Sequence, residues 1–542
     1  MTNRFLVFLI SIFLFSCSSD DMGDSDNRDS SVNIIEITNV TSNSARIEAT
    51  VEGANISEKG IVWGMTSNPT IENAENVSKG NGTGSFTAAI SGLTAATEYF
   101  VRAYSINNGE TLYSNNENFI TNQSCPQENV YSGQVELNTQ DDVNNFGANN
   151  YCEISGDLII GYYNFSPPIE DLSPLSSLTK VNELLIYGNH NLTNLSGLEN
   201  IHTVERLIGV TQCHGLTSLD ELSNITGELE YLSIIDNQNI ENFDGLIGIT
   251  KVREDIRIVE NHNLESILGL SGLQDVGDTL FVIDNNNLEN LNGLENVTSV
   301  GNYLWIHNNA SLKNIDGLSN VTYIRSITLQ NNPELQNLVG LSNVSQVDSQ
   351  LNIKKNNSLI TLEGLSNISL ENVDVEISNN SSLQNLDGLS SNNSVLEIAI
   401  TSNANLKNIS ALSGMVEVFG SFKLRGSGLL ENLDGLSNLQ TVGTDFTITD
   451  VNMLTQFSGL SSLVSVGRDF SILENNVLQN LDSLENLIFV GDNFRITNNP
   501  TLTDFCGISN LVTNGTIEGN YQVSNNAFNP SEQNIIDGNC SQ

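Results

Sequence analysis

Basic side chains are scarce in this sequence. Its 542 residues include 20 Lys and Arg against 64 Asp and Glu, which gives a formal net charge of −44. A surface of this charge argues against nucleic-acid binding and fits a strongly solvated extracellular surface. Catalytic and nucleotide-binding signatures are missing as well, because the sequence contains no Ser-His-Asp order, phosphate loop or nucleotide fingerprint. We therefore expect no catalytic residues, no cofactor and no metal site.

Apolar runs long enough to cross a membrane are also missing. The run at 5–15 is too short to span a bilayer, and with Arg4 before it, residues 1–17 have the features of a targeting segment. Residues 14–17 read Leu-Phe-Ser-Cys and resemble a bacterial lipobox, which implies lipidation of Cys17. The alternative is an ordinary signal peptide with an incidental Cys. The next residues, Ser-Ser-Asp-Asp, resemble the acidic tag of outer-surface lipoproteins in some Gram-negative bacteria, and we expect residues 18–31 to form a flexible acidic tether.

Residues 32–122 have the pattern of a separate β domain. Alternating apolar runs separated by Gly, Asn and Ser turns occur at 32–37, 45–51, 60–64, 85–90, 99–106 and 118–121. The segment 92–103, Gly-Leu-Thr-Ala-Ala-Thr-Glu-Tyr-Phe-Val-Arg-Ala, resembles the corner of fibronectin type III domains, in which a Tyr hydroxyl is tied back to the preceding loop. The resemblance implies a β-sandwich that acts as a spacer, with ligand binding as the alternative.

One unit recurs through most of the remaining chain. In the copy at 288–309, apolar residues fall every third position from Leu288 to Val300 and then alternate at Leu304 and Ile306. Alternation is typical of a strand with one buried face, whereas a spacing of three fits neither a helix nor a strand. Gly and Asn separate the parts, so each unit is a strand plus a coil of short turns. With only one apolar edge, the unit must stack on copies of itself.

The copies keep a common register. An anchor residue recurs every 23 or 24 positions, at Leu175, Leu198, Leu222, Leu246, Leu270, Leu294, Leu318, Leu341, Leu365, Leu389, Leu412, Leu436, Leu460, Leu484 and Ile508. Nine positions before each anchor after the first stands Asn in 11 of 14 copies, and Cys213, Ser427 and Val451 are the exceptions. Stacked Asn side chains can bond backbone groups that a buried turn would leave unpaired. The register predicts a solenoid.

The first copy and the repeat pattern resemble a known family. Residues 152–160, Cys-Glu-Ile-Ser-Gly-Asp-Leu-Ile-Ile, resemble the opening strand of a receptor L-domain, and the pattern over about 150–528 resembles bacterial relatives of these domains, which are cousins of leucine-rich repeats. The resemblance implies a mostly β chain with a right-handed parallel β-solenoid of about 16 rungs over 125–542, ending at a strand with Tyr521 and Val523. It also implies that Cys213 fills the position that Asn occupies in most copies, which we call the ladder position. Receptor L-domains have only a handful of rungs, so hormone recognition is not implied.

Four cysteines flank the two ends of this array. Cys125 and Cys152 lie beside the first rung, and Cys506 and Cys540 beside the last. A solenoid has two apolar ends that must be covered. Outside the cytoplasm we therefore expect Cys125–Cys152 and Cys506–Cys540 disulfides as caps.

Acidic pairs on the outward face leave an enzymatic alternative open. Asp374 and Glu397 share one outward column, as do Asp445 and Asp469. Paired carboxylates can serve acid–base chemistry or hold Ca²⁺, as in β-helical polysaccharide lyases. In a chain this acidic, we interpret them as solvated surface.

Three histidines occupy one turn position. His190, His214 and His262 each follow the ladder residue, and the first two lie on adjacent rungs. Two imidazoles one strand spacing apart can hold a metal weakly. Because Gln238 interrupts the column and no carboxylate completes it, we favour a plain polar turn.

One stretch of the outward face stands apart from its polar surroundings. Four adjacent rungs present Arg257 and Val259 together with a predicted ligand-binding set of Tyr231, Ile235, Phe281, Ile283, Tyr303, Trp305 and His307. Exposed apolar patches usually mark contact sites, and aromatic rings suit sugar faces or protein hot spots. The alternatives are that strands simply favour such residues, or that the type III-like module folds back over the patch.

The sequence thus predicts a cell-surface lipoprotein of the outer membrane that binds or adheres without catalysis. Its expected partner is an extracellular glycan or protein, and it contacts the membrane only through its lipid anchor. The alternative is a β-helical polysaccharide-processing enzyme.

Overall fold

The computed structural model describes residues 30–38, 40–122, 124–162, 168–389 and 393–542. The chain divides into two compact units, Met1–Ser124 and Cys125–Gln542. Cys17 and most of the predicted tether lie outside the described residues. Within the described ranges, no helix has both the length and the apolar character needed to cross a membrane.

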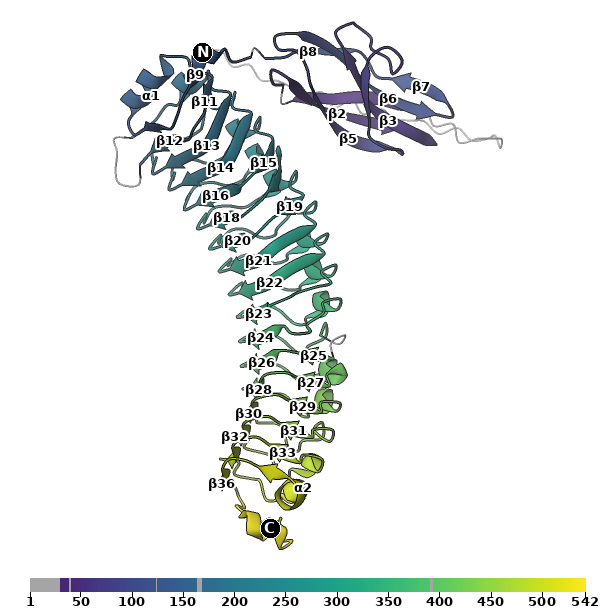
Figure 1. The fold of residues 1–542 in the computed structure, drawn as a ribbon, viewed down its shortest axis with the longest axis vertical. Coiled ribbons are helices and arrows are strands. Elements are labelled where there is room, and N and C mark those ends of the chain that lie inside the picture. The colour runs from purple at the N-terminus through teal and green to yellow at the C-terminus, as the bar shows by residue number, and fades with distance from the viewer. Residues whose placement is uncertain (1–29, 39, 123, 163–167, 390–392) are drawn as a thin grey trace, which may run out of the picture. The chain divides into compact units, whose positions relative to one another are not determined.

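The first unit consists of two antiparallel sheets (Figure 1). One contains β1 (Ser31–Thr38), β2 (Ser44–Glu52) and β5 (Gly84–Ser91); the other contains β4 (Glu75–Ser78), β3 (Ile56–Gly64), β6 (Glu98–Asn107), β7 (Glu110–Tyr113) and β8 (Glu117–Ile120). Alternate residues such as Ile47, Ile61 and Val101 are fully buried and form one core shared by both sheets. The strands β4 and β7 were not predicted, because they are short and contain no buried residue.

The second unit is a solenoid-like stack of parallel strands, as predicted. A 22-stranded sheet contains β9 (Val130–Tyr131), β10 (Val135–Leu137), β11 (Glu153–Ile154), β12 (Leu158–Gly161), β13 (Lys180–Tyr187), β14 (Thr203–Thr211), β15 (Gly227–Leu229), β16 (Tyr231–Ile235), β17 (Ile249–Val252), β18 (Ile256–Val259), β19 (Asp275–Val276), β20 (Leu280–Ile283), β21 (Ser299–His307), β22 (Tyr323–Gln330), β23 (Gln350–Lys354), β24 (Asp374–Ser378), β26 (Glu397–Thr401), β28 (Phe422–Arg425), β30 (Phe446–Thr449), β32 (Phe470–Leu473), β34 (Phe494–Thr497) and β36 (Tyr521–Ser524). In Figure 1 the strands from β16, β18 and β20 down to β36 run along the inner side of a gentle bend in the second unit, whereas β15 and β19 lie on its other side.

A second, narrower sheet lies on the other side of the stack. It contains β25 (Ser394–Val395), β27 (Glu417–Val418), β29 (Thr441–Val442), β31 (Ser465–Val466), β33 (Phe489–Val490) and β35 (Thr516–Ile517). Between the two sheets, most anchors close a three-residue turn of 3-10 helix, such as Asp316–Leu318. Apolar side chains from all sides fill one continuous core. The spacing of three in the sequence therefore reflects short turns around that core.

The glycine before many anchors is required by close approach between rungs. A Cβ on Gly269 would lie 1.6 Å from the carbonyl oxygen of Phe243 in the preceding rung. From the sequence, we interpreted this glycine as a turn residue. At Gly269 the reason is different, because the backbone of one rung lies where a side chain would project.

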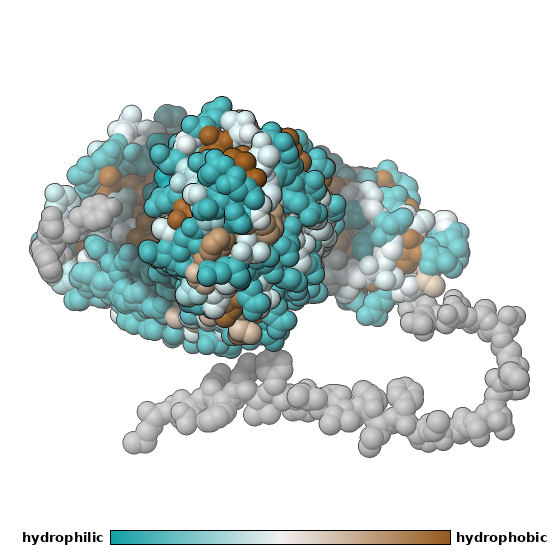
Figure 2. All heavy atoms as spheres, turned by 90° about the horizontal axis from the view of Figure 1, so that it is seen from below, coloured by the Kyte–Doolittle hydropathy of each residue, from teal (hydrophilic) through white to brown (hydrophobic). Residues whose placement is uncertain are grey.

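Both ends of the stack are covered. The helix α1 (Gln140–Gly147) and the Cys125–Cys152 disulfide lie at the start, and α2 (Ser509–Asn514), α3 (Glu532–Ile536) and the Cys506–Cys540 disulfide lie at the end. Both predicted disulfides are thereby confirmed. In Figure 2, seen from below, the C-terminal end is covered mostly by hydrophilic residues, as an end exposed to water requires.

Candidate functional site

The outward residues of the long sheet form columns, because the strands pair in register. Arg257 pairs with Phe281, which pairs with Trp305, and this central column crosses β18, β20 and β21. The ring centroids of Phe281 and Trp305 are 6.0 Å apart, and the guanidinium carbon of Arg257 lies 5.5 Å from the Phe281 centroid. Trp305 is 41% exposed, so this row of flat groups remains open to solvent.

A second column runs beside the first. Ile235, Val259, Ile283 and His307 follow one another on β16, β18, β20 and β21, and each is half-buried. Burial lowers the pKa of His307 below its ordinary value, and the nearby Asp284 carboxylate offsets this only in part. His307 is therefore uncharged at neutral pH, which leaves the column apolar in character.

The third column is less continuous than the sequence suggested. Tyr231 and Tyr303 occupy it, but Asp255 and Thr279 stand between them on the intervening rungs. Tyr303 is 39% exposed and Tyr231 is half-buried. All seven predicted residues lie on the same side of one sheet, yet Tyr231 is separated from the aromatic group around Trp305.

The apolar surface extends further toward the N-terminus than predicted. Ile159 pairs with Leu185, and Leu207 pairs with Tyr231. Leu185 is only 7% exposed because it leans over Gly209, where an added Cβ would lie 2.8 Å from a Leu185 methyl carbon. Counting the same outward positions back through the first rungs would have identified these residues. We call the outward side of β12–β21 the apolar face; it comprises Ile159, Leu185, Tyr187, Leu207, Tyr231, Ile235, Arg257, Val259, Phe281, Ile283, Tyr303, Trp305 and His307.

The acidic pairs lie where the sequence placed them, and the contacts of Asp469 are structural. Asp374 pairs with Glu397 across β24 and β26. Asp469 accepts hydrogen bonds from the backbone N–H of Asn493 at 3.0 Å and from its side chain at 2.8 Å, and it forms an ion pair with Arg495 at 2.7 Å. These contacts occupy the Asp469 oxygens and leave little room for a metal ion or a substrate.

The histidine column does not converge on a point. The rings of His190 and His214 stack with centroids 4.6 Å apart and planes 25° apart. Stacked rings direct their nitrogen lone pairs side by side, whereas a metal ion requires them to converge. His262 is bonded at Nδ1 to the carbonyl oxygen of Asp284 at 2.9 Å. Across the described residues, no cluster of three or more His, Cys, Asp or Glu side chains could hold a metal ion.

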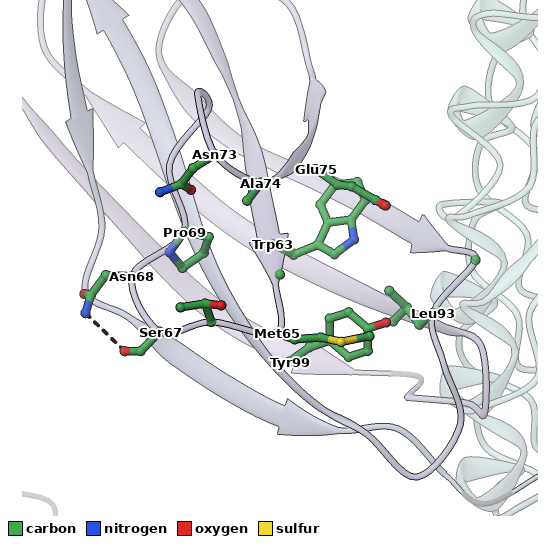
Figure 3. Close-up of a pocket in the computed structure, with 13 residues that line it drawn as sticks. Trp63, Met65, Ser67, Asn68, Pro69, Asn73, Ala74, Glu75, Leu93 and Tyr99 are labelled. Carbon is green, nitrogen blue, oxygen red and sulfur yellow. Dashed lines mark hydrogen bonds between the residues drawn. The ribbon is translucent and has the colours of Figure 1, made fainter.

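The first unit carries a separate pocket of about 480 Å³ (Figure 3). Met65, Leu93 and Tyr99 lie at one end of it, and Asn68, Pro69 and Asn73 at the other. The Tyr99 hydroxyl accepts a hydrogen bond at 3.0 Å from the backbone N–H of Thr94, which is the tie that the sequence led us to expect. Its ring also stacks on Phe119 at 5.9 Å, so Tyr99 holds the corner of the unit together.

Comparison with known proteins adds little. No family model matches the chain, and no curated protein matches it. Among solved structures, a short form of the sensor domain of the anti-sigma factor RsgI4 from Pseudobacteroides cellulosolvens matches 18% of this chain and 96% of that domain, at 16% identity and a TM-score of 0.15. A solution structure of the same sensor domain matches 18% of this chain and 80% of that one, at 15% identity and a TM-score of 0.14. Similarity this low carries no argument about function.

Proposed function

We propose that this chain is a cell-surface lipoprotein whose solenoid binds an extracellular ligand through the apolar face. In this proposal Cys17 carries the lipid anchor and residues 18–31 form the tether. Residues 32–122 form a fibronectin type III-like spacer. The second unit is a right-handed receptor L-domain-like solenoid of about 16 rungs that presents the binding surface.

The apolar face is the single observation that carries the proposal. Beyond it, the same central column continues on β22, β23 and β24 with Thr328, Asn352 and Glu376. The same fold therefore accepts polar residues at this position, and strand propensity alone does not require Phe281 and Trp305. Soluble proteins rarely expose a contiguous apolar surface without a contact to make.

A non-enzymatic role is supported by the state of one of the two acidic pairs, Asp445 and Asp469. General acid–base catalysis needs two carboxyl groups with free oxygens facing a substrate. Asp469 has its oxygens bonded to Asn493 and Arg495, and Asp445 lies 3.8 Å from the guanidinium of Arg468. We accordingly propose binding without catalysis.

The test is to screen the purified chain against glycan and protein arrays and to repeat the screen with a Phe281→Ala/Trp305→Ala variant. Both residues point away from the core, so we expect normal folding and at least a tenfold loss of affinity, about 1.4 kcal/mol. Lys423→Ala/Thr447→Ala is the matched control, because these residues hold the same column on β28 and β30. Full binding by the Phe281/Trp305 variant would rule out the apolar face as the site.

A further inference from the structure

Two stacks of carboxylates border the apolar face. On the side where the strands begin, the Asp278 N–H donates to the carbonyl oxygen of Glu254 at 3.2 Å, and the Glu254 N–H to that of Glu230 at 2.9 Å. These three acidic residues therefore occupy one position on successive rungs. On the side where the strands end, one position on successive rungs is likewise occupied by acidic residues, namely Asp236, Glu260 and Asp284. Each has the left-handed conformation, with φ between 52° and 57°.

Most of these carboxylates have no ion-pair partner among the residues that the structure describes. Glu230 is paired with Arg206 at 2.5 Å, and Arg257 on the face is held by Asp255 at 2.8 Å. In the part of the chain that the structure describes, no Lys or Arg forms an ion pair with Glu254, Asp278, Glu260 or Asp284. Stacked acids about 4.8 Å apart repel one another. A ligand with positive charges at both borders would relieve that repulsion.

The chemistry of the face favours a polypeptide over a sugar. Ile235, Val259 and Ile283 form an aliphatic column with no hydrogen-bonding groups. Sugars carry many hydroxyl groups, and burying them against such a column leaves those groups unpaired. Apolar side chains of a polypeptide fit the same column without that cost. An acidic ligand of either class would be repelled by the borders.

The width of the face indicates the form of the polypeptide. The two borders stand six residues apart along the chain, just outside strands such as β18, so the distance between them is at most roughly 20 Å at about 3.3 Å per residue. A helix is about 10–12 Å in diameter, so long basic side chains on its flanks could reach both borders while its apolar stripe contacts the columns. An extended segment would point alternate side chains away from the sheet.

We propose that the apolar face binds a cationic amphipathic helix, with the apolar stripe on the Phe281–Trp305 and Ile235–Ile283 columns and Lys or Arg side chains at the carboxylate borders. The partner is thus a basic protein segment. This inference rests on the proposed function, since it names the ligand class for the same face.

The test uses Trp305 as a reporter at the site. The chain has two tryptophans, and Trp63 lies buried in the first unit at 7% exposure, so Trp63→Phe leaves Trp305 as the single tryptophan. The probe is a synthetic helical peptide of Leu and Lys. Its Leu residues recur at alternating intervals of three and four residues and so form one apolar stripe. We expect a saturable blue shift of Trp305 emission that weakens with added salt, and no shift with the matched Leu and Glu peptide. Anisotropy of the labelled peptide with the native chain gives the same comparison if Trp63→Phe fails to fold.

Variants in which the border carboxylates are neutralised give the decisive comparison. Glu254→Gln/Glu260→Gln/Asp278→Asn/Asp284→Asn should weaken binding of the cationic peptide at least tenfold. Asp450→Asn/Glu474→Gln changes the same turn position on distant rungs and should leave the affinity unchanged. Equal binding of both peptides, no binding of the cationic one, or full affinity in the quadruple variant would overturn the inference. If an array ligand still binds in a Trp305-dependent manner, the proposed function survives that result; if none does, the proposed function fails as well.

Discussion

At the scale of single residues, the hydrogen bonds at the ladder position explain why Asn recurs there in 11 of 14 copies. The Asn285 N–H donates to Asn309 Oδ1 at 3.0 Å, and its side-chain amide donates to the carbonyl oxygen of Ile258 at 2.8 Å. Each ladder Asn thus joins neighbouring rungs while fully buried. Cys213 occupies the same position, where its N–H donates to Asn237 Oδ1 at 2.9 Å and its thiol to the carbonyl oxygen of Ile186 at 3.6 Å.

Substitutions in the ladder should therefore differ in how much stability they cost. Cys213→Asn restores the common residue, and we expect little or no loss of stability in chemical denaturation. Asn285→Ala leaves buried backbone groups unpaired and should cost about 1–3 kcal/mol. A large loss from Cys213→Asn would mean that the position is misassigned.

Burial also raises the pKa of the Cys213 thiol to about 12, so iodoacetamide should not modify it in the folded chain.

Asp469 gives the solenoid a pH-dependent contribution to stability. Burial acts to raise its pKa, but hydrogen bonds from Asn493 and the charge of Arg495 outweigh it, so its pKa lies below its ordinary value. A depressed carboxyl pKa stabilises the fold above the unfolded value of about 3.9 and loses that effect as the pH falls through the folded value. Asp469→Asn should therefore be less stable than the native chain at pH 7, with the difference shrinking below about pH 4. A difference that stays constant from neutral pH to pH 3 would contradict this account.

At the scale of elements, the ends of the stack matter most. Rungs are stabilised chiefly by their neighbours, so a poorly covered end should unfold inward. We expect Cys506→Ser to lower stability by ~2–5 kcal/mol. In this variant, backbone hydrogen exchange should become faster in β34 and β36, which lie next to the C-terminal cap, before it changes in β21. Uniform acceleration along the whole sheet would show that the cap does not act locally.

The repeating elements could be predicted because each one carries the same pattern. Anchors, ladder and strand pairs are visible in the sequence since every rung buries the same positions. The left-handed residue before the ladder, such as Glu260 with φ 57°, was not predicted, because Asp, Glu, Asn, Lys, Gln and Ser all occupy it and only Gly188 and Gly426 give a signal. The helix α1 and the strand β10 were also not predicted, since they occur once and lie outside the repeat.

The candidate site was predicted only in part, for a related reason. Phe281 and Trp305 stand out in the sequence as aromatic residues at outward positions. The borders formed by Glu254 and Glu260 do not stand out in a chain with 64 acidic residues. Their significance depends on which rungs they join and which cations lie near them, and that information is three-dimensional.

At the scale of the whole molecule, the proposed location can be tested separately from binding. If Cys17 is lipidated and the acidic tag is recognised, added protease should remove the protein from intact cells. Cys17→Ala should release it from the membrane fraction, which immunoblotting of fractionated cells would detect. Protection from protease in intact cells would contradict surface exposure while leaving lipidation untouched.

Hydroxyl-radical footprinting tests the central claim, that the apolar face is the recognition surface, most directly. The chain would be oxidised alone and when saturated with the tightest ligand found on the arrays. We predict that Phe281, Tyr303 and Trp305 become protected, while Met453, 48% exposed, and Met65, 57% exposed in the first unit, react as before. Protection of Met65 with Trp305 still fully reactive would place the site in the first unit and contradict the account.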